Sequence, residues 1–238
     1  MLKRILAAWL VANFLIVGTI SWLTGGWYLG WQYSPAVIML AELGLIMMPN
    51  LLIPVLILRS WWPESVGDLR EALGWQWNGG RAVIFGIAAF LVALLLMAII
   101  NRLVGESIPY NLPGAGGGIT AKKLLDVAGL LLGLLAFMAI TVLGEETIFR
   151  GWIQTQVGYR HGVWAGLMLA AVLFGLRHLP ADIYFAYIWH ATPRIWLSRQ
   201  LQLYAVAFCL GLARHFGGST YASAIMHVLI LAVALFRF

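Results

Sequence analysis

The sequence predicts an all-α fold, a polytopic transmembrane helix bundle with about eight spans that forms one integral membrane domain over residues 1–238. Of the 238 residues, 62% are hydrophobic and 10% are charged, and the mean hydropathy is +0.90. A soluble domain has roughly a quarter of its residues charged, so this chain lacks the polar groups to cover a surface in water. The apolar runs are longer than barrel strands and do not alternate, so their backbone hydrogen bonds must close within helices.

The charge of the chain fits a membrane better than a nucleic acid. Its net charge of +6 comes from 15 Lys and Arg against 9 Asp and Glu. The basic residues stand singly between apolar runs and form no patch, so the lipid bilayer is the expected partner and nucleic acid is not. The single cysteine, Cys209, excludes an intramolecular disulfide and a cysteine-based zinc site.

The expected spans are the apolar runs of about 20 residues, which is the length needed to cross the hydrocarbon core. In the N-terminal part, residues 1–121, they cover 5–24, 35–58 and 82–100. In the C-terminal part, residues 122–238, one begins at Lys123, and the others cover 161–179, 182–197, 200–214 and 219–236. The span at 182–197 is interrupted by Pro193, which does not suit the interior of a helix.

Two connections between the spans are polar. Residues 60–80 contain four Trp and mixed charges, as in an amphipathic segment at the membrane interface. Residues 104–120 contain a glycine-rich run and are expected to form a flexible loop. Lys3 and Arg4 precede the first span, which places the N-terminus in the cytoplasm by the positive-inside rule. That span exceeds the core of a cleaved signal peptide, and more spans follow it, so we expect it to be retained.

Ionisable side chains within the spans are candidates for function, because burying one in hydrocarbon costs roughly 3 kcal/mol or more unless it is paired or faces water. The strongest candidates all lie in the C-terminal part: Glu145, Glu146, Arg150, Arg177, His178 and His227. Glu42 and His190 are weaker candidates, since a single acid near a helix start and a histidine near a proline have ordinary interfacial explanations.

The two adjacent glutamates are expected to differ in their partners. On a helix, Glu146 and Arg150 are four residues apart and can form an ion pair. Glu145 is rotated from Glu146 by about 100° and has no partner on its own face at that spacing. A free carboxylate in a low-dielectric cavity binds a proton more readily, which suits a base that takes a proton from water.

The expected depths bring the acids and the histidines together. If the glycine-bounded turn at 158–162 makes two helices antiparallel, Glu145 lies about 20 Å from the turn and His178 about 24 Å. Phe174 precedes His178 by one turn and can pack against its imidazole, and His227 lies at membrane depth in the last span. These side chains can therefore surround one site.

Three motifs stand in order in separate apolar spans: Glu145-Glu146-x-x-x-Arg150, Phe174-x-x-x-His178 and His227. They resemble, in order and spacing, the motif series of the CPBP family of intramembrane proteases, which includes the type II CAAX prenyl endopeptidases and the Abi, or bacteriocin-immunity, relatives. The resemblance covers residues 124–236. It implies an intramembrane endopeptidase in which Glu145 activates a water, His178 positions it and His227 stabilises the oxyanion. By the same resemblance, Glu146 and Arg150 hold the helix in register.

One position departs from the family pattern. The family usually has Asn or Asp four residues after the last histidine, and here that residue is Leu231. Loss of an oxyanion donor costs ~10²- to 10³-fold in rate, so either another group such as Ser223 takes its place or the chain is slow or inactive. The alternatives to a protease are therefore a non-catalytic immunity or scaffold protein of the same fold, and a transporter, suggested by Glu42.

The motif residues also have purely structural explanations. The acids with Arg150 could form an ion-pair network that locks a helix, His178 could bond at the interface, and His227 could be a satisfied core histidine. We expect chemistry without a metal, and zinc held by Glu145, His178 and His227 is the alternative. The expected substrate is a membrane-associated peptide or protein, and the family implies a multi-pass protein of a bacterial cell membrane.

Overall fold

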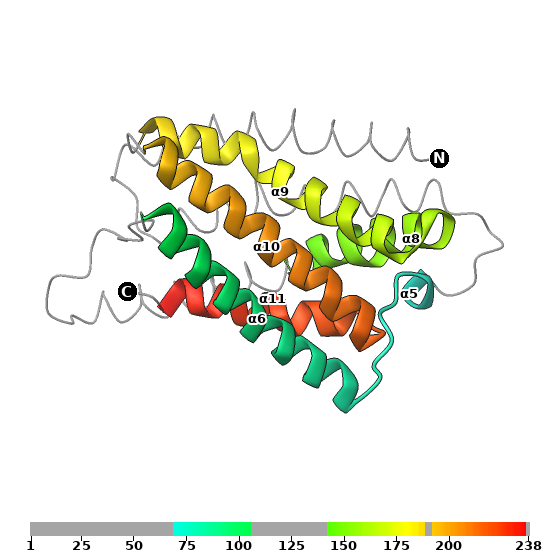
Figure 1. Cartoon of the computed structure of the whole chain (residues 1–238). Helices are drawn as coiled ribbons and strands as arrows, with labels where there is room; N and C mark the ends of the chain where they lie inside the picture. Colours follow the sequence, from blue (N-terminus) through cyan, green and yellow to red (C-terminus); the bar gives the residue numbers. More distant parts are fainter. Residues whose placement is uncertain (1–68, 106–141, 189–191, 237–238) are drawn as a thin grey trace, which may run out of the picture. The chain divides into compact units, whose positions relative to one another are not determined.

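A computed structural model of the chain describes residues 69–105, 142–188 and 192–236 (Figure 1). Every regular element within these residues is a helix, which confirms the all-α prediction for them. The chain divides into two compact units, and the elements below belong to the unit formed by residues 61–109 and 145–237. Several predictions fall outside the described residues, namely the spans at 5–24 and 35–58, most of the loop at 104–120, Glu42 and His190.

Helix α6 (Gly80–Val104) forms at the predicted span 82–100 and buries a face of small residues. That face carries Ala82, Gly86, Ala89 and Ala93. The large side chains point away from the unit, and more than half of the surface is exposed in Ile84, Leu91, Leu95 and Leu103. Small residues inside and large apolar residues outside are typical of a helix that packs closely on its neighbours and faces lipid.

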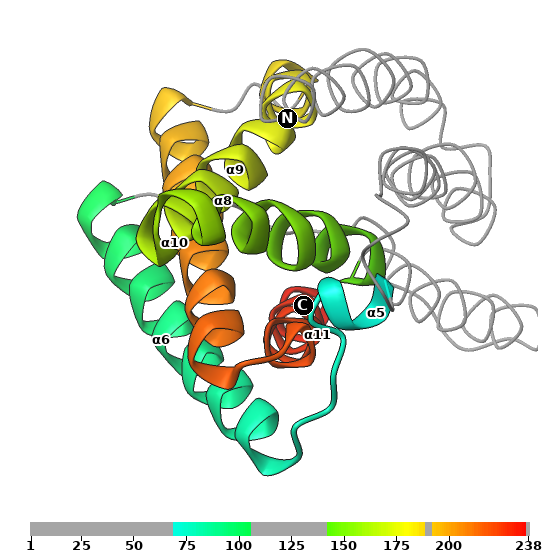
Figure 2. The same cartoon turned by 90° about the vertical axis from the view of Figure 1, so that its right-hand side faces the viewer.

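Helix α10 (Pro193–Gly217) is the central element of the unit and contacts α6, α9, α11 and η3 (Figures 1 and 2). It begins where the sequence predicted an interruption, because Pro193 occupies the first helical turn, where its missing N–H is not needed. The hydroxyl of Thr192 caps this turn by accepting from the backbone N–H of Ile195. Helix α9 (Val163–Ile188) ends before it. The predicted span at 182–197 is therefore wrong: residues 182–188 belong to the end of α9 and residues 193–197 to the start of α10.

The acidic motif lies on an unusual helix. Residues Glu146–Gln154 form a π-helix, η3, whose hydrogen bonds close wider turns than those of an α-helix. It continues into α8 (Thr155–His161), and Gly162, with a positive φ of 91°, connects α8 to α9. Of the predicted turn at 158–162, only Gly162 lies in the connection, because residues 158–161 belong to α8. The π-helix was not predicted, because it leaves no periodic signal in so short a segment.

The short helix α5 (Leu69–Ala72) leads into a segment that holds α11 (Thr220–Phe236) in place. The hydroxyl of Thr220 donates to the carbonyl of Leu73 at 2.7 Å, and its backbone N–H donates to the carbonyl of Gly74 at 2.8 Å. These bonds satisfy donors at the start of α11, which otherwise have no partner within the helix. They therefore set the position of the helix that carries His227.

Two of the described helices, α6 and α10, are long and apolar enough to cross a membrane. Shorter apolar stretches cover Val163–Leu179 of α9 and Thr220–Val233 of α11. These segments agree with a helical membrane protein, whereas the predicted total of about eight spans is not confirmed by the described residues.

Candidate active site

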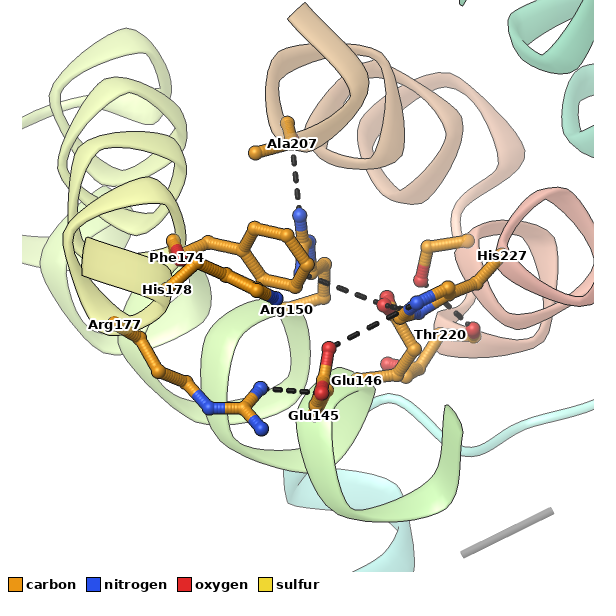
Figure 3. Close-up of polar contacts among 10 residues, drawn as sticks. Glu145, Glu146, Arg150, Phe174, Arg177, His178, Ala207, Thr220 and His227 are labelled. Carbon is orange, nitrogen blue, oxygen red and sulfur yellow. Dashed lines mark hydrogen bonds and ion pairs between the residues drawn. The ribbon is translucent and has the colours of Figure 1, made fainter. Parts of the chain in front are cut away.

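Two carboxylates and one imidazole meet where the start of η3 faces α11 (Figure 3). Oε1 of Glu146 lies 2.8 Å from Nδ1 of His227, which is a hydrogen bond. Oε2 of Glu145 lies 3.8 Å from Nε2 of the same ring. One histidine therefore faces both adjacent acids, one through each ring nitrogen, and all three side chains are buried.

Glu146 forms the ion pair that the spacing predicted. Nη1 of Arg150 lies 3.4 Å from Oε1 of Glu146, and both side chains are 0% exposed. Nη2 of Arg150 donates to the carbonyl of Ala207 on α10 at 3.0 Å, and the guanidinium lies over the ring of Phe174, 4.6 Å from its centroid. The pair is thus enclosed by α9, α10 and η3, and it joins these helices as well as neutralising the acid.

Glu145 also has a partner, and the expectation that it would be free is wrong. Nη1 of Arg177 forms an ion pair with Oε1 of Glu145, and each side chain is 7% exposed. Arg177 comes from α9, so the pair joins two helices and cannot be found from spacing along one of them. Arg177 had been noted as an ionisable residue in an apolar run, which was the only signal that the sequence offered.

Phe174 brings the second histidine to the same place. Nδ1 of His178 lies 2.8 Å from the carbonyl oxygen of Phe174, and the two rings lie 4.8 Å apart. The Phe174 ring also meets the ring of His227 edge to face at 6.0 Å. His178 is close enough to Glu145 for the two groups to interact electrostatically. One buried aromatic ring therefore contacts both histidines and Arg150.

The hydrogen bonds indicate which ring nitrogens remain available for chemistry. A carbonyl and a carboxylate oxygen can only accept, so Nδ1 of His178 and Nδ1 of His227 are the donors in their bonds. In the neutral ring the other nitrogen, Nε2, then carries a lone pair. Both histidines therefore have an Nε2 that can accept a proton from water.

Sequence reasoning missed the contacts that hold η3 in place. Nε1 of Trp75 donates to the hydroxyl of Thr147 at 3.0 Å, and a Cβ on Gly151 would lie 2.8 Å from the carbonyl oxygen of Leu73. Trp75 is buried, so it packs inside the unit, although residues 60–80 were expected to lie at the interface. The segment after α5 thus contacts both the helix with the acids and the helix with His227.

Ser223 does not present its hydroxyl as the sequence suggested. It is fully buried, and its Oγ donates to the carbonyl of Thr220 in its own helix at 2.9 Å. The hydroxyl also interacts with the carboxylate of Glu146, so its single proton is engaged by oxygens of the chain and is not available to an oxyanion. Leu231, one turn beyond His227, offers no polar group in its place.

The zinc alternative was compared with the donor groups present. Within the ranges that the structure describes, no three His, Cys, Asp or Glu side chains are grouped so that they could hold a metal ion. Each histidine donates from Nδ1 to an oxygen and keeps Nε2, an arrangement that zinc-binding histidines also have, so only the missing group of three ligands among the described residues counts against the zinc site. These residues therefore give no support to a three-ligand zinc site.

Comparison with known proteins agrees with the motifs. Residues 127–233 match the family model of Rce1-like proteins, described as type II CAAX prenyl endopeptidase Rce1-like. No curated protein and no solved structure matches the chain. The matched range contains all three motifs and confirms the resemblance to the CAAX proteases. Together with the apolar helices, this similarity agrees with an integral membrane protein.

Proposed function

We propose that the protein is an intramembrane endopeptidase of the CAAX protease type, in which Glu145 activates a water that attacks a peptide bond at or near the membrane. The observation that carries this proposal is the 3.8 Å separation between Oε2 of Glu145, the proposed base, and Nε2 of His227, the proposed donor to the oxyanion. This separation is too long for a direct hydrogen bond, so a water that donates to Oε2 of Glu145 can lie beside Nε2 of His227, where the carbonyl it attacks comes within reach of that nitrogen. The lone pairs of the water oxygen then remain free for a carbonyl carbon.

The proposed reaction uses the chain's own acids and imidazoles. Glu145 takes one proton from the water as the new C–O bond forms, which leaves a negative charge on the former carbonyl oxygen. His178 accepts a hydrogen bond from the water and orients it, and His227, when protonated at Nε2, donates to the oxyanion. The carboxyl of Glu145 then gives its proton to the leaving nitrogen as the C–N bond breaks. Glu146 supports a protonated His227 through Nδ1.

The proposed chemistry uses no metal, and the proposed substrate is a peptide or protein segment next to a lipid anchor or a transmembrane end. The family name suggests a prenylated CAAX segment as the substrate of relatives. None of the contacts described above indicates a binding site for a prenyl group. We place the protein, with about eight spans and a cytoplasmic N-terminus, in a bacterial cell membrane. The helices of residues 122–238 form the catalytic part.

The test compares the purified full-length protein with two variants in a cleavage assay on membrane peptides. Glu145→Gln preserves the shape of the side chain but removes the base, so we expect the rate to fall at least ~10²-fold. Asp182→Asn is the matched control, because Asp182 is an equally buried acid paired with an arginine, Arg199, at 2.6 Å. It should leave cleavage near the wild-type rate.

The same assay is repeated with a chelator. Cleavage that survives chelation but not Glu145→Gln supports the metal-free proposal. Activity that is lost with the chelator and restored by zinc contradicts the metal-free chemistry. Cleavage that Glu145→Gln leaves unchanged contradicts the assignment of the base, and a wild-type protein that cleaves no peptide favours the immunity or scaffold alternative, which rests on Leu231.

A further inference from the structure

The residue that pairs with Glu145 lies outside the three motifs. Arg177 precedes His178 on α9 and is buried, with 7% of its side chain exposed. Its guanidinium forms an ion pair with Oε1 of Glu145, while Oε2 of the same carboxylate faces His227. The two oxygens of Glu145 are thus divided between an arginine on one side and an imidazole on the other.

The other buried arginine of the site already has other partners. Arg150 pairs with Oε1 of Glu146 and donates to the carbonyl of Ala207. Arg177 is therefore the cation that contacts Glu145 directly. This matters because a carboxylate buried without a cation takes up a proton and becomes neutral, and a neutral carboxyl cannot act as a base.

We infer that Arg177 is a positioning residue for the proposed base: it keeps Glu145 ionised and turns Oε2 towards His227. This inference rests on the proposed function. Arg177 and His178 are consecutive on α9, so one turn of that helix supplies both the group that holds the base and an imidazole beside it. The α9–η3 packing then sets the geometry of the reaction, because the ion pair spans these two elements.

The first test measures kcat and KM for three arginine variants of the full-length protein. Arg177→Gln should lower kcat by ~10²-fold with little change in KM, since a misplaced base affects the reacting geometry more than substrate binding. Arg177→Lys keeps the charge and should recover most of this loss. Arg199→Gln is the matched control, since Arg199 on α10 pairs with Asp182 on α9, and it should leave kcat near the wild-type value.

Added guanidinium ions provide a rescue that a purely structural role does not predict. We expect guanidinium chloride at low concentration to restore part of the activity of Arg177→Gln, and sodium chloride at equal ionic strength to restore none. A kcat for Arg177→Gln equal to that of the wild type overturns the inference, and so does an equal loss in Arg199→Gln.

A second measurement separates this inference from the proposed function, because it needs no substrate. Infrared spectroscopy distinguishes a protonated carboxyl from a carboxylate by its C=O stretching band. At neutral pH, Arg177→Gln should show a protonated carboxyl band that is absent in the wild type and in the double variant Arg177→Gln/Glu145→Gln. If Arg177→Gln shows no such band, the inference fails even when the wild-type protein cleaves peptides. If the band appears and no peptide is cleaved, the proposed function fails alone.

Discussion

The two glutamate–arginine pairs of the site share the same chemistry and differ in their surroundings. Glu146 and Arg150 lie on one helix and are 0% exposed, whereas Glu145 and Arg177 join two elements and are each 7% exposed. His227 is hydrogen-bonded to the first pair at 2.8 Å and lies 3.8 Å from the acid of the second. The comparison assigns the two pairs different roles. The enclosed pair, Glu146 and Arg150, holds the site together, and the pair at the edge, Glu145 and Arg177, is left within reach of water.

The strongest way to test this division is to break the enclosed pair. Arg150→Met leaves Glu146 without its cation at a site that water does not reach, which should destabilise the fold by about 3–5 kcal/mol. Arg177→Met should cost less, because Glu145 lies at the edge of the site, with 7% of its side chain exposed, and can take up a proton from water and become neutral. Thermal unfolding of both purified variants in detergent measures the difference. Equal losses of stability would mean that the two pairs do not differ as their surroundings suggest.

A smaller effect is expected from the ring that supports the enclosed pair. Phe174→Leu removes the face under Arg150 and the edge beside His227, at a cost of about 1–2 kcal/mol. It should also lower kcat, because both histidines lose a neighbour that holds their rings. The control in the unfolding and cleavage assays is Phe216→Leu. It removes a ring away from the site that stacks on Phe85, with the two ring centroids 5.9 Å apart. A similar drop in kcat in the control would count against a special role for Phe174.

The smallest effect is expected at Ser223, which belongs to neither pair. Ser223→Ala removes the hydrogen bond to the carbonyl of Thr220 and the interaction with the carboxylate of Glu146, so it should cost about 1 kcal/mol and leave kcat unchanged. Steady-state cleavage kinetics provide the measurement. A rate loss of ~10²-fold would instead identify Ser223 as a donor to the oxyanion, which is the role that the sequence predicts for it if it replaces the donor missing at Leu231.

The contrast between the pairs also explains what the sequence could predict. Glu146 and Arg150 were found because a helix brings residues four apart onto one face. The convergence of the acids with His227 followed from the depths of the spans. The partner of Glu145 was missed because Arg177 arrives from another helix, and its direction depends on packing that spacing along one chain does not contain. The contact of Trp75 was missed for the same reason, since its partner, Thr147, is 72 residues away.

The start of α10 was missed for a local reason. Pro193 was taken as an interruption, whereas the first turn of a helix accepts proline, and the capping hydroxyl of Thr192 distinguishes the two cases. A search for capping residues next to each proline would have corrected this boundary from sequence alone.

The wide turns of η3 have a consequence for how the chain tolerates changes in length. A turn closed by i→i+5 bonds contains one residue more than a turn of an α-helix. The segment between Glu146 and Gln154 therefore contains more residues than an α-helix of the same length would need. At the end of this segment, Nε2 of Gln154 donates a hydrogen bond to the carbonyl of Gly211 at 2.9 Å. Losing one residue between these points would let the helix contract to ordinary winding with the two acids kept near their present direction, whereas the same loss in an α-helix would turn them by about 100° about its axis. The wide turns of η3 can therefore absorb the loss of one residue that an α-helix in this place could not.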